Sequence, residues 1–228
     1  MSIGAMAKER EAARGAAEEV VEQKPLRERI LSAAFASFRE NGFGRASTLD
    51  IATRARVSKR ELYSLFGSKQ QMLVTCIAER SQRMRLPANW PAPRDRKDLE
   101  AGLFEFGCVM LREVSDPDVI AVFRLAISEA DHSPEVARAL DAYGRKASFA
   151  ALREILDGAQ ASGLLAGVDL DRFAGCFMSL LMGDVVMGLS LGLRKRPAVK
   201  EMRQRAQVAT QASLALAQGS ALKVLAAD

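Results

Sequence analysis

Residue types that carry catalytic and metal chemistry are scarce in this sequence. Its 228 residues include one histidine, His132, and three cysteines, Cys76, Cys108 and Cys176. No two cysteines stand at a metal-binding or redox spacing, and their odd number favours reduced thiols in a cytoplasmic protein. Nucleophile motifs, phosphate-binding glycine loops and metal-spaced clusters are missing as well. The sequence therefore predicts a protein that is not an enzyme and needs no cofactor or metal.

Residues that favour strands are also few. β-Branched and aromatic residues are sparse beside Ala, Leu, Arg and Glu, and no alternation of apolar and polar residues lasts long enough for a sheet. We therefore predict an all-α fold. The charged, alanine-rich residues 1–23 lack an apolar signal core, so we expect a disordered or frayed tail and no secretory signal.

Proline marks one strong division in the helical part of the chain. The stretch "LPANWPAPRD" contains three prolines and predicts a linker between domains over residues 24–86 and 87–228. In the first domain, apolar spacing and helix-start residues predict helices over about 25–41, 47–55, 58–66 and 68–85. In the second domain they predict helices over about 96–114, 117–131, 134–160, 169–194 and 198–226.

Positive charge is concentrated in the first domain. From Lys24 to Lys69 ten Lys or Arg stand against four Asp or Glu, whereas from Pro87 to the end seventeen stand against eighteen. A basic block on an otherwise balanced chain indicates an acidic partner, which is either nucleic acid or an anionic membrane surface.

The segment that begins at Ser58 has the features of a DNA-reading helix. Ser58 and Glu61 form an S-x-x-E capping box, which starts a helix directly after a very short connector. Two short helices joined by a tight turn form a helix-turn-helix, whose second helix enters the major groove. Lys59 and Arg60 would there reach guanine edges or phosphate oxygens, and the hydroxyl of Tyr63 suits a phosphate.

Neighbouring helix starts add groups that suit phosphate oxygens. Ser47 or Thr48 offers a hydroxyl at one start, and Lys69 lies at another, where a cation and the positive end of the macrodipole coincide. Exposed Lys and Arg are also common as ordinary solvated surface, so the spacing of the helices is the stronger indication. The residues predicted to contact DNA are Arg45, Ser47, Thr48, Arg56, Ser58, Lys59, Arg60, Tyr63 and Lys69.

The first domain also resembles the DNA-binding domain of TetR-type (TetR/AcrR) transcriptional regulators. The resemblance covers "ILSAAFASFRENGFGRASTLDIATRARVSKRELYSLFGSKQQML". Two positions depart from the family pattern: Arg56 stands where the family usually has Gly, and Leu65 stands where it often has His or Tyr. The matching elements, in order, are Ile30 to Phe38, Gly42-Phe43, Thr48, Ile51-Ala52, Ala55, Val57-Ser58, Leu62-Tyr63, Phe66 and Ser68-Lys69.

The resemblance implies that the second helical domain dimerises and often holds a ligand. Few polar groups lie among its large soft side chains, so we expect an apolar ligand. The expected pocket residues are Phe104, Cys108, Phe123, Phe149, Phe177 and Leu181. The expected dimer-interface residues are Leu180, Asp184, Gly188, Met202, Val208 and Ala212.

Residues 173–193 are long and apolar enough to cross a membrane. Asp184 near the centre of this segment opposes a span, because a charge there is costly in lipid. The cations after residue 193 would also place the helix-turn-helix on the side of the membrane away from the DNA. We therefore predict a buried core helix and no membrane span.

Together these features predict a cytoplasmic, homodimeric regulator of a double-stranded DNA operator, which is a repressor released by a hydrophobic small molecule. One alternative is a ligand-independent DNA binder or an activator. Another, from a different class, is a basic helical protein that binds partners or a membrane surface. That alternative needs an apolar stripe beside the basic block, whereas the apolar residues here are used to pack the helices.

Overall fold

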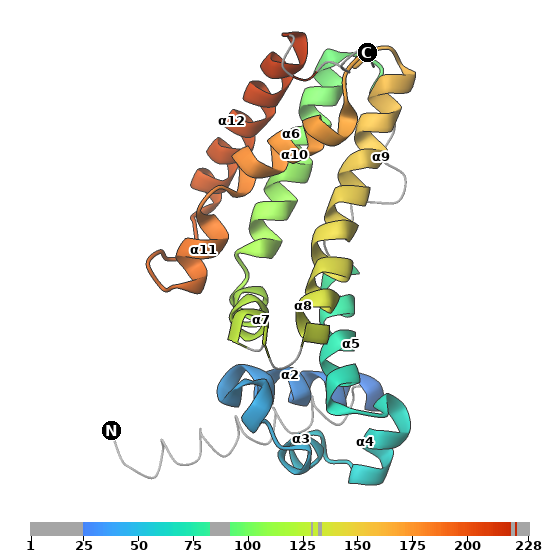
Figure 1. Cartoon of the computed structure of the whole chain (residues 1–228), viewed down its shortest axis with the longest axis vertical. Coiled ribbons are helices and arrows are strands. Elements are labelled where there is room, and N and C mark those ends of the chain that lie inside the picture. The colour runs from blue at the N-terminus through green and yellow to red at the C-terminus, as the bar shows by residue number, and fades with distance from the viewer. Residues whose placement is uncertain (1–24, 83–91, 129, 132–133, 220–221, 223–228) are drawn as a thin grey trace, which may run out of the picture. The chain divides into compact units, whose positions relative to one another are not determined.

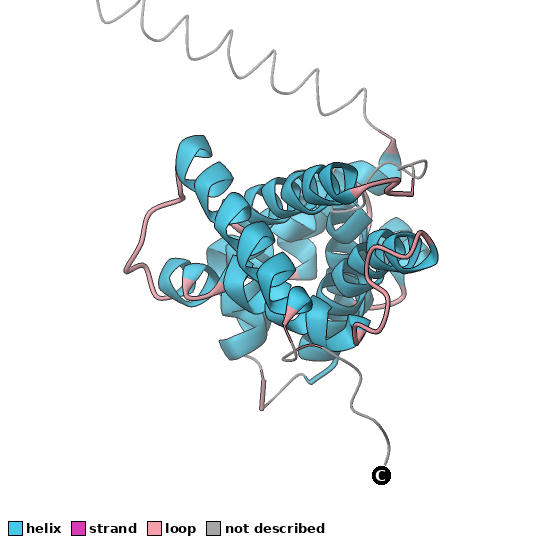
Figure 2. Cartoon of the chain, turned by 90° about the horizontal axis from the view of Figure 1, so that it is seen from above, coloured by secondary structure: helices cyan, strands magenta, loops and turns pink. Residues whose placement is uncertain are grey.

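The described part of the chain is built from helices. The computed structural model describes residues 25–82, 92–128, 130–131, 134–219 and 222, and within these ranges all regular structure is helical (Figure 2). This confirms the all-α prediction. The chain divides into two compact units, Met1–Cys76 and Ile77–Asp228. The predicted tail over residues 1–23, His132 and the predicted boundary after residue 86 lie outside the described residues.

The first unit is formed by helices of different lengths. They are α2 (Leu26–Arg45), α3 (Thr48–Ala55), α4 (Lys59–Phe66) and the first part of α5 (Lys69–Gln82) (Figure 1). α2 is interrupted at Gly42, whose φ of 74° and ψ of 165° are not helical and are readily adopted by glycine. This break is the predicted end of the first helix, and a short helical turn follows it.

The core of the first unit lies where these helices pack on one another. Ile30 and Phe38 of α2, Ile51 of α3, and Leu62 and Phe66 of α4 are all buried. α4 has only eight residues, too few for a stable isolated helix, so burial of its two apolar side chains holds it in place. The opposite face of α4 is thereby left to solvent.

The second unit contains a larger number of helices. They are α6 (Arg96–Val114), α7 (Pro117–Ser128), α8 (Pro134–Leu140), α9 (Ala147–Ala161), α10 (Leu170–Met182), α11 (Val185–Ser190) and α12 (Val199–Gln218), with the π-helical segment η1 (Asp141–Lys146) between α8 and α9. α6, α9, α10 and α12 lie side by side and share one hydrophobic core (Figure 1). Phe106 and Phe177 are fully buried there, with ring centroids 6.1 Å apart.

Two predicted helices differ from the observed elements. The helix predicted over 134–160 contains the π-helical turn η1, and the backbone stays helical at Leu140 and Ala147 on either side of it. The helix predicted over 169–194 ends at Gly183, where φ is 45° and ψ is −121°, and resumes as α11. Neither interruption can be predicted from the spacing of the apolar residues, because the apolar pattern continues through both.

Arg205 of α12 occupies the break between α10 and α11. It donates hydrogen bonds to the carbonyl oxygens of Leu181 at 2.6 Å and Met182 at 3.4 Å, which the end of α10 leaves without helical partners. A side chain at Gly183 would collide with this guanidinium. Composition and length alone would allow Leu170–Ser190 to cross a membrane, but the segment is two helices whose buried residues belong to the core.

Candidate nucleic-acid interface and ligand cavity

α4 begins with two exposed cations. The Ser58 hydroxyl accepts a hydrogen bond from the Glu61 N–H at 3.1 Å, and the Glu61 carboxylate accepts one from the Ser58 N–H at 2.8 Å, as the capping box predicts. Lys59 and Arg60 follow, and neither forms a hydrogen bond or an ion pair with another described residue. Cations at a helix N-terminus are opposed by the macrodipole, so an anion at this position would be stabilising.

The cap of α4 depends on pH. The pKa of Glu61 is lowered, first by the N–H of Ser58, then by the Ser58 hydroxyl and the charge of Arg29. A lowered pKa means that the cap stabilises the fold at pH values above the ordinary glutamate pKa of about 4.3. This stabilisation is lost as the pH falls through the lowered pKa of Glu61.

We therefore expect Glu61→Gln to be less stable than the wild type at neutral pH and equally stable in acid. Urea unfolding of both proteins at stepped pH measures this, and a difference that stays constant with pH would contradict it.

In the turn before α4, which follows the last residue of α3, Arg56 adopts the left-handed backbone conformation. Its φ of 53° and ψ of 51° lie in a region that costs a side-chain-bearing residue roughly 1–2 kcal/mol. The N–H of Val57 bonds the Ala52 oxygen at 3.0 Å and that of Arg56 bonds the Thr53 oxygen at 3.1 Å, the pattern of a Schellman motif. The structure thus accommodates Arg where the family pattern has Gly.

Arg29 of α2 holds this turn, a role that the sequence did not indicate. Its guanidinium donates to the Ala55 oxygen at 2.8 and 3.1 Å and to the Arg56 oxygen at 2.9 Å. These carbonyls stand at the negative end of α3, where a cation is favoured. Arg29 therefore fixes the angle at which α4 leaves α3, and no local motif could have revealed a partner 26 residues away.

Hydroxyl groups from α3 and α4 meet beside the two cations. The Tyr63 hydroxyl donates to the Thr48 hydroxyl at 3.2 Å, which joins the exposed face of α4 to the first residue of α3. Ser47 caps α3 through a hydrogen bond from the Leu49 N–H at 3.2 Å. Each hydroxyl keeps further donor or acceptor capacity. The structure thus brings together Ser47, Thr48 and Tyr63, which the sequence had placed near one phosphate backbone.

Lys69 is arranged differently from the predicted phosphate contact. Its ammonium donates to the carbonyl oxygens of Phe43 at 2.7 Å, Ala46 at 3.2 Å and Gly44 at 3.3 Å, and it lies 4.6 Å from the centroid of the Phe43 ring. Three acceptors match the three donors of an ammonium group. Lys69 therefore ties the start of α5 to the end of α2 in the free protein.

Arg45 is exposed and uses only its Nε–H, which donates to the Asn41 oxygen at 3.2 Å. Its terminal nitrogens are left to solvent among the described residues. Arg54, in contrast, is paired with Glu40 at 2.7 Å and with Asp50 at 3.0 Å. Among the described residues of the first unit, Arg45, Lys59 and Arg60 are thus exposed cations with side-chain donors left for an anion.

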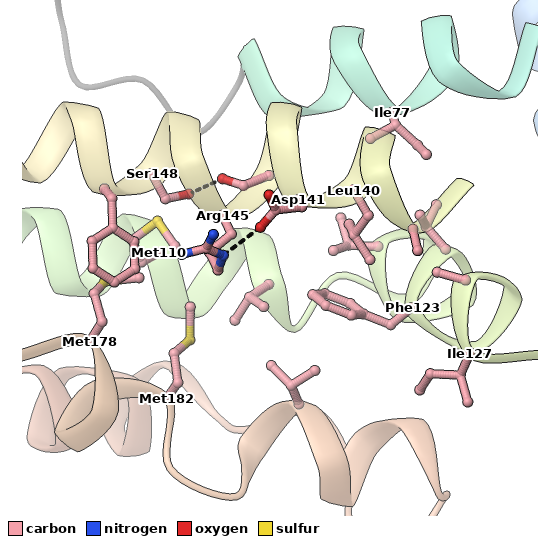
Figure 3. A pocket seen from close by; sticks show the side chains of 18 of the residues that line it. Ile77, Met110, Phe123, Ile127, Leu140, Asp141, Arg145, Ser148, Met178 and Met182 are labelled. Atoms are coloured by element: carbon pink, nitrogen blue, oxygen red, sulfur yellow. Dashed lines mark hydrogen bonds and ion pairs between the residues drawn. The ribbon is translucent and has the colours of Figure 1, made fainter. Parts of the chain in front are cut away.

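The second unit contains a cavity of about 950 Å³. Its wall is mostly apolar and includes Met110 of α6, Phe123 of α7, Phe149 of α9, and Met178 and Met182 of α10 (Figure 3). This volume lies in the range of small-molecule sites, and flexible thioethers suit irregular apolar ligands. The cavity can therefore enclose a small apolar molecule.

Comparison with known proteins matches both units. Residues 30–76 match the model of bacterial regulatory proteins of the tetR family, and residues 101–216 match the C-terminal domain of AefR-like transcriptional repressors. The second match alone spans more than half of the chain.

The chain belongs to the TetR family.

Individual members of this family resemble the regulator at low identity. The HTH-type transcriptional regulator YezE of Bacillus subtilis is 23% identical over 144 residues, which cover 62% of this chain and 74% of YezE. A TetR transcriptional regulator from Agrobacterium tumefaciens has a TM-score of 0.69 at 24% identity, covering 85% of this chain and 94% of its own. The repressor MexZ of Pseudomonas aeruginosa has a TM-score of 0.62 at 23% identity, covering 88% and 98%. These likenesses establish a shared fold.

The cavity of this TetR-family regulator includes part of the predicted pocket. Phe123 and Phe149 line it. Phe177 and Leu181 are instead fully buried in the helix core, because their side of α10 faces the neighbouring helices. The predicted residues that do not line the cavity are Phe104, Cys108, Phe177 and Leu181. Sequence reasoning missed the polar wall residues Asp141 and Arg145, since a charged pair at helical spacing looks like ordinary surface.

The predicted dimer residues fall into two groups in the single TetR-family chain. Gly188 and Met202 are buried: the side chain of Arg194 covers the glycine, and Met202 faces the core. These two positions therefore serve the fold of one chain. Ala212 is half-buried. Exposed predicted residues are Leu180, Asp184 and Val208.

Proposed function

We propose that this TetR-family transcriptional regulator is a homodimeric repressor that binds a pseudo-palindromic DNA operator and is released by a small apolar effector. The start of α4 is the observation that supports DNA binding: Lys59 and Arg60 are exposed there, and neither has a hydrogen-bond or ion-pair partner among the residues that the structure describes. A helix-turn-helix uses this part of its second helix to contact base edges. Repression agrees with the AefR-like repressor domain that residues 101–216 match. The protein would act in the cytoplasm, where its operator lies.

Backbone contacts would come from the groups around α4. The hydroxyls of Ser47, Thr48 and Tyr63 and the side chain of Arg45 are placed to bind phosphates and fix the orientation on DNA. Arg56, at the turn, adds a cation beside them. Ser58 serves chiefly as the helix cap, because its hydroxyl is already used there.

A dimer would present two copies of α4 to two half-sites. Exposed apolar side chains on α10 and α12 support an interface there: Leu180 is 41% exposed, Val208 57% and Leu216 39%. These two helices pack on each other within the chain, so a second copy could bury both in one self-complementary contact. The stripe of exposed apolar residues would then be removed from water.

The DNA-binding proposal is tested by selecting bound sequences from a random DNA pool with the full-length protein. We expect an enriched inverted repeat whose half-site centres lie about one helical turn, or a multiple of it, apart. A single unrepeated motif would contradict the dimeric mode, and the absence of any enriched sequence would contradict specific binding. Repeating the selection with cell extract identifies fractions that release the DNA.

The cavity offers a direct test of effector release through Gly175. This residue lines the cavity from the middle of α10, and a Cβ placed there meets no atom within 4 Å. Gly175→Phe would therefore occupy part of the cavity without disturbing the helix. We expect this variant to bind the operator as tightly as the wild type and to stay bound when the releasing fraction is added, as measured by fluorescence anisotropy.

Gly175→Ala is the matched control. Its single methyl group leaves most of the cavity open and should stabilise α10 by roughly 0.5–1 kcal/mol, as alanine does in place of a mid-helix glycine. We expect it to release DNA normally and to melt at a slightly higher temperature. If Gly175→Phe is released as readily as this control, the cavity does not hold the effector.

A further inference from the structure

The polar groups of the cavity are gathered on one part of its wall. Asp141 and Arg145 belong to the π-helical segment η1, and Ser148 follows in the first turn of α9. Figure 3 shows these three side chains close together, with Met110, Met178 and Met182 also lining the cavity nearby. A bound molecule would meet charge at this part of the wall and apolar surface over most of the remainder.

Positive charge prevails at this part of the wall. The Asp141 carboxylate pairs with Arg145 at 2.5 Å and with Lys146 at 3.2 Å, so two cations surround a single anion. Of these two cations only Arg145 lines the cavity. The net charge of the cluster is therefore +1, and an anionic group of a ligand would be attracted to it, whereas a cationic group would be repelled.

Arg145 keeps donors available for such a group. Its Nε–H is used by Asp141, and among the described residues no acceptor is placed for its terminal nitrogens. The guanidinium lies 5.9 Å from the centroid of the Phe149 ring, which together with Asp141 fixes its orientation. A planar guanidinium presents its terminal N–H groups as a fork that matches the two oxygens of a carboxylate.

We propose that the cavity selects an amphipathic acid: a small molecule with an apolar body and one carboxylate, which Arg145 binds. The inference rests on the proposed function, because it takes this cavity as the effector site. The Arg145 side chain is 61% exposed, so the carboxylate would remain partly hydrated while the apolar body lies against the methionines and Phe123. A neutral molecule with the same apolar body would bury the same apolar surface but would form no charged hydrogen bonds with Arg145.

The test is calorimetric titration of the full-length protein with two matched sets of probes. One set is dodecanoate, dodecanol and dodecylamine, and the other is biphenyl-4-ylacetate, 2-(biphenyl-4-yl)ethanol and 2-(biphenyl-4-yl)ethylamine. Within each set the body is constant and the head group is anionic, neutral or cationic. We expect the acid to bind at least about tenfold more tightly than the alcohol in one set or both, and the amine to bind most weakly.

Arg145→Gln should weaken binding of the acid about tenfold and change binding of the alcohol by less than about twofold. Arg153→Gln is the matched control. Arg153 is a cation in the middle of α9 that pairs with Asp157 and Asp171 and does not line the cavity. We expect this control to retain the preference of the wild type.

Equal binding of acid and alcohol would overturn the proposal, and so would an acid preference that survives Arg145→Gln or a lack of binding by both acids. These failures are distinct from failure of the proposed function. If neutral probes bind and release the operator, effector release stands and the acid preference is wrong. If an acid binds through Arg145 without releasing the operator, the acid site stands and effector release is wrong.

Discussion

Replacing Lys59 and Arg60 together with alanine will weaken specific operator binding by at least about thirtyfold. Both side chains are exposed at the first turn of α4, and a good contact from such a side chain to a base contributes about 1–3 kcal/mol of discrimination. Loss of two contacts therefore corresponds to roughly 2–6 kcal/mol, or about 30-fold to more than 10⁴-fold. Fluorescence anisotropy with the selected operator, at one fixed salt concentration, measures the change.

The matched control is Arg96→Ala with Lys97→Ala. These residues open α6 directly after its cap, as Lys59 and Arg60 open α4, so the change in net charge and the position in the helix are the same. We expect the control to alter operator affinity by less than about threefold. A change of this size would come only from the long-range electrostatic attraction between the protein and DNA. Neither pair of cations is buried, so we expect both double variants to be folded, and circular dichroism checks this. Unchanged affinity of the α4 variant would refute the assignment of the reading helix.

Lys69→Ala will destabilise the first unit by about 1.5–3 kcal/mol, the usual contribution of hydrogen bonds to a charged group. The Lys69 ammonium is bound to three carbonyl oxygens and lies against the Phe43 ring, and its loss leaves those oxygens without a donor. Hydrogen–deuterium exchange will be faster in α3, α4 and the start of α5. Operator binding will weaken as well, because the reading helix is less well held.

The salt dependence separates this structural role from a phosphate contact. If Lys69 neutralises a phosphate, its removal lowers the slope of log affinity against log salt by about 0.9 and leaves stability unchanged. If it holds the end of α2, stability falls and the slope stays the same. Lys69→Met, which keeps the aliphatic stem and loses the donors, is expected to behave like Lys69→Ala, and a stability equal to the wild type would argue for the phosphate.

Local signals in the sequence were sufficient for the helix starts of the first unit. Ser58 and Glu61, and likewise Ser47, carry their capping function within three residues, so their spacing alone predicted hydrogen bonds that the structure contains. Ser68 caps the next helix in the same way, accepting from the Gln71 N–H at 3.0 Å. The buried positions of α4 followed from their period.

Features that depend on distant partners could not be predicted. Lys69 looked like a phosphate contact because its position at a helix start is local, whereas the carbonyls that bind it lie 23–26 residues earlier. The break at Gly183 depends on Arg205 from another helix. For the cavity, residue type identified large apolar side chains but not which of them face a void: Phe123 lines the cavity, whereas Phe177 is buried in the helix core.

If the cavity is the effector site, the open space beside Gly175 gives this protein a simple route to new effectors. A Cβ at this position meets nothing within 4 Å, so alanine, valine, leucine and phenylalanine would shorten the cavity in successive steps while the helix stays intact. A single codon could thus change the size of accepted molecule without altering DNA recognition in the other unit. Size selection and operator choice can therefore evolve independently in this protein.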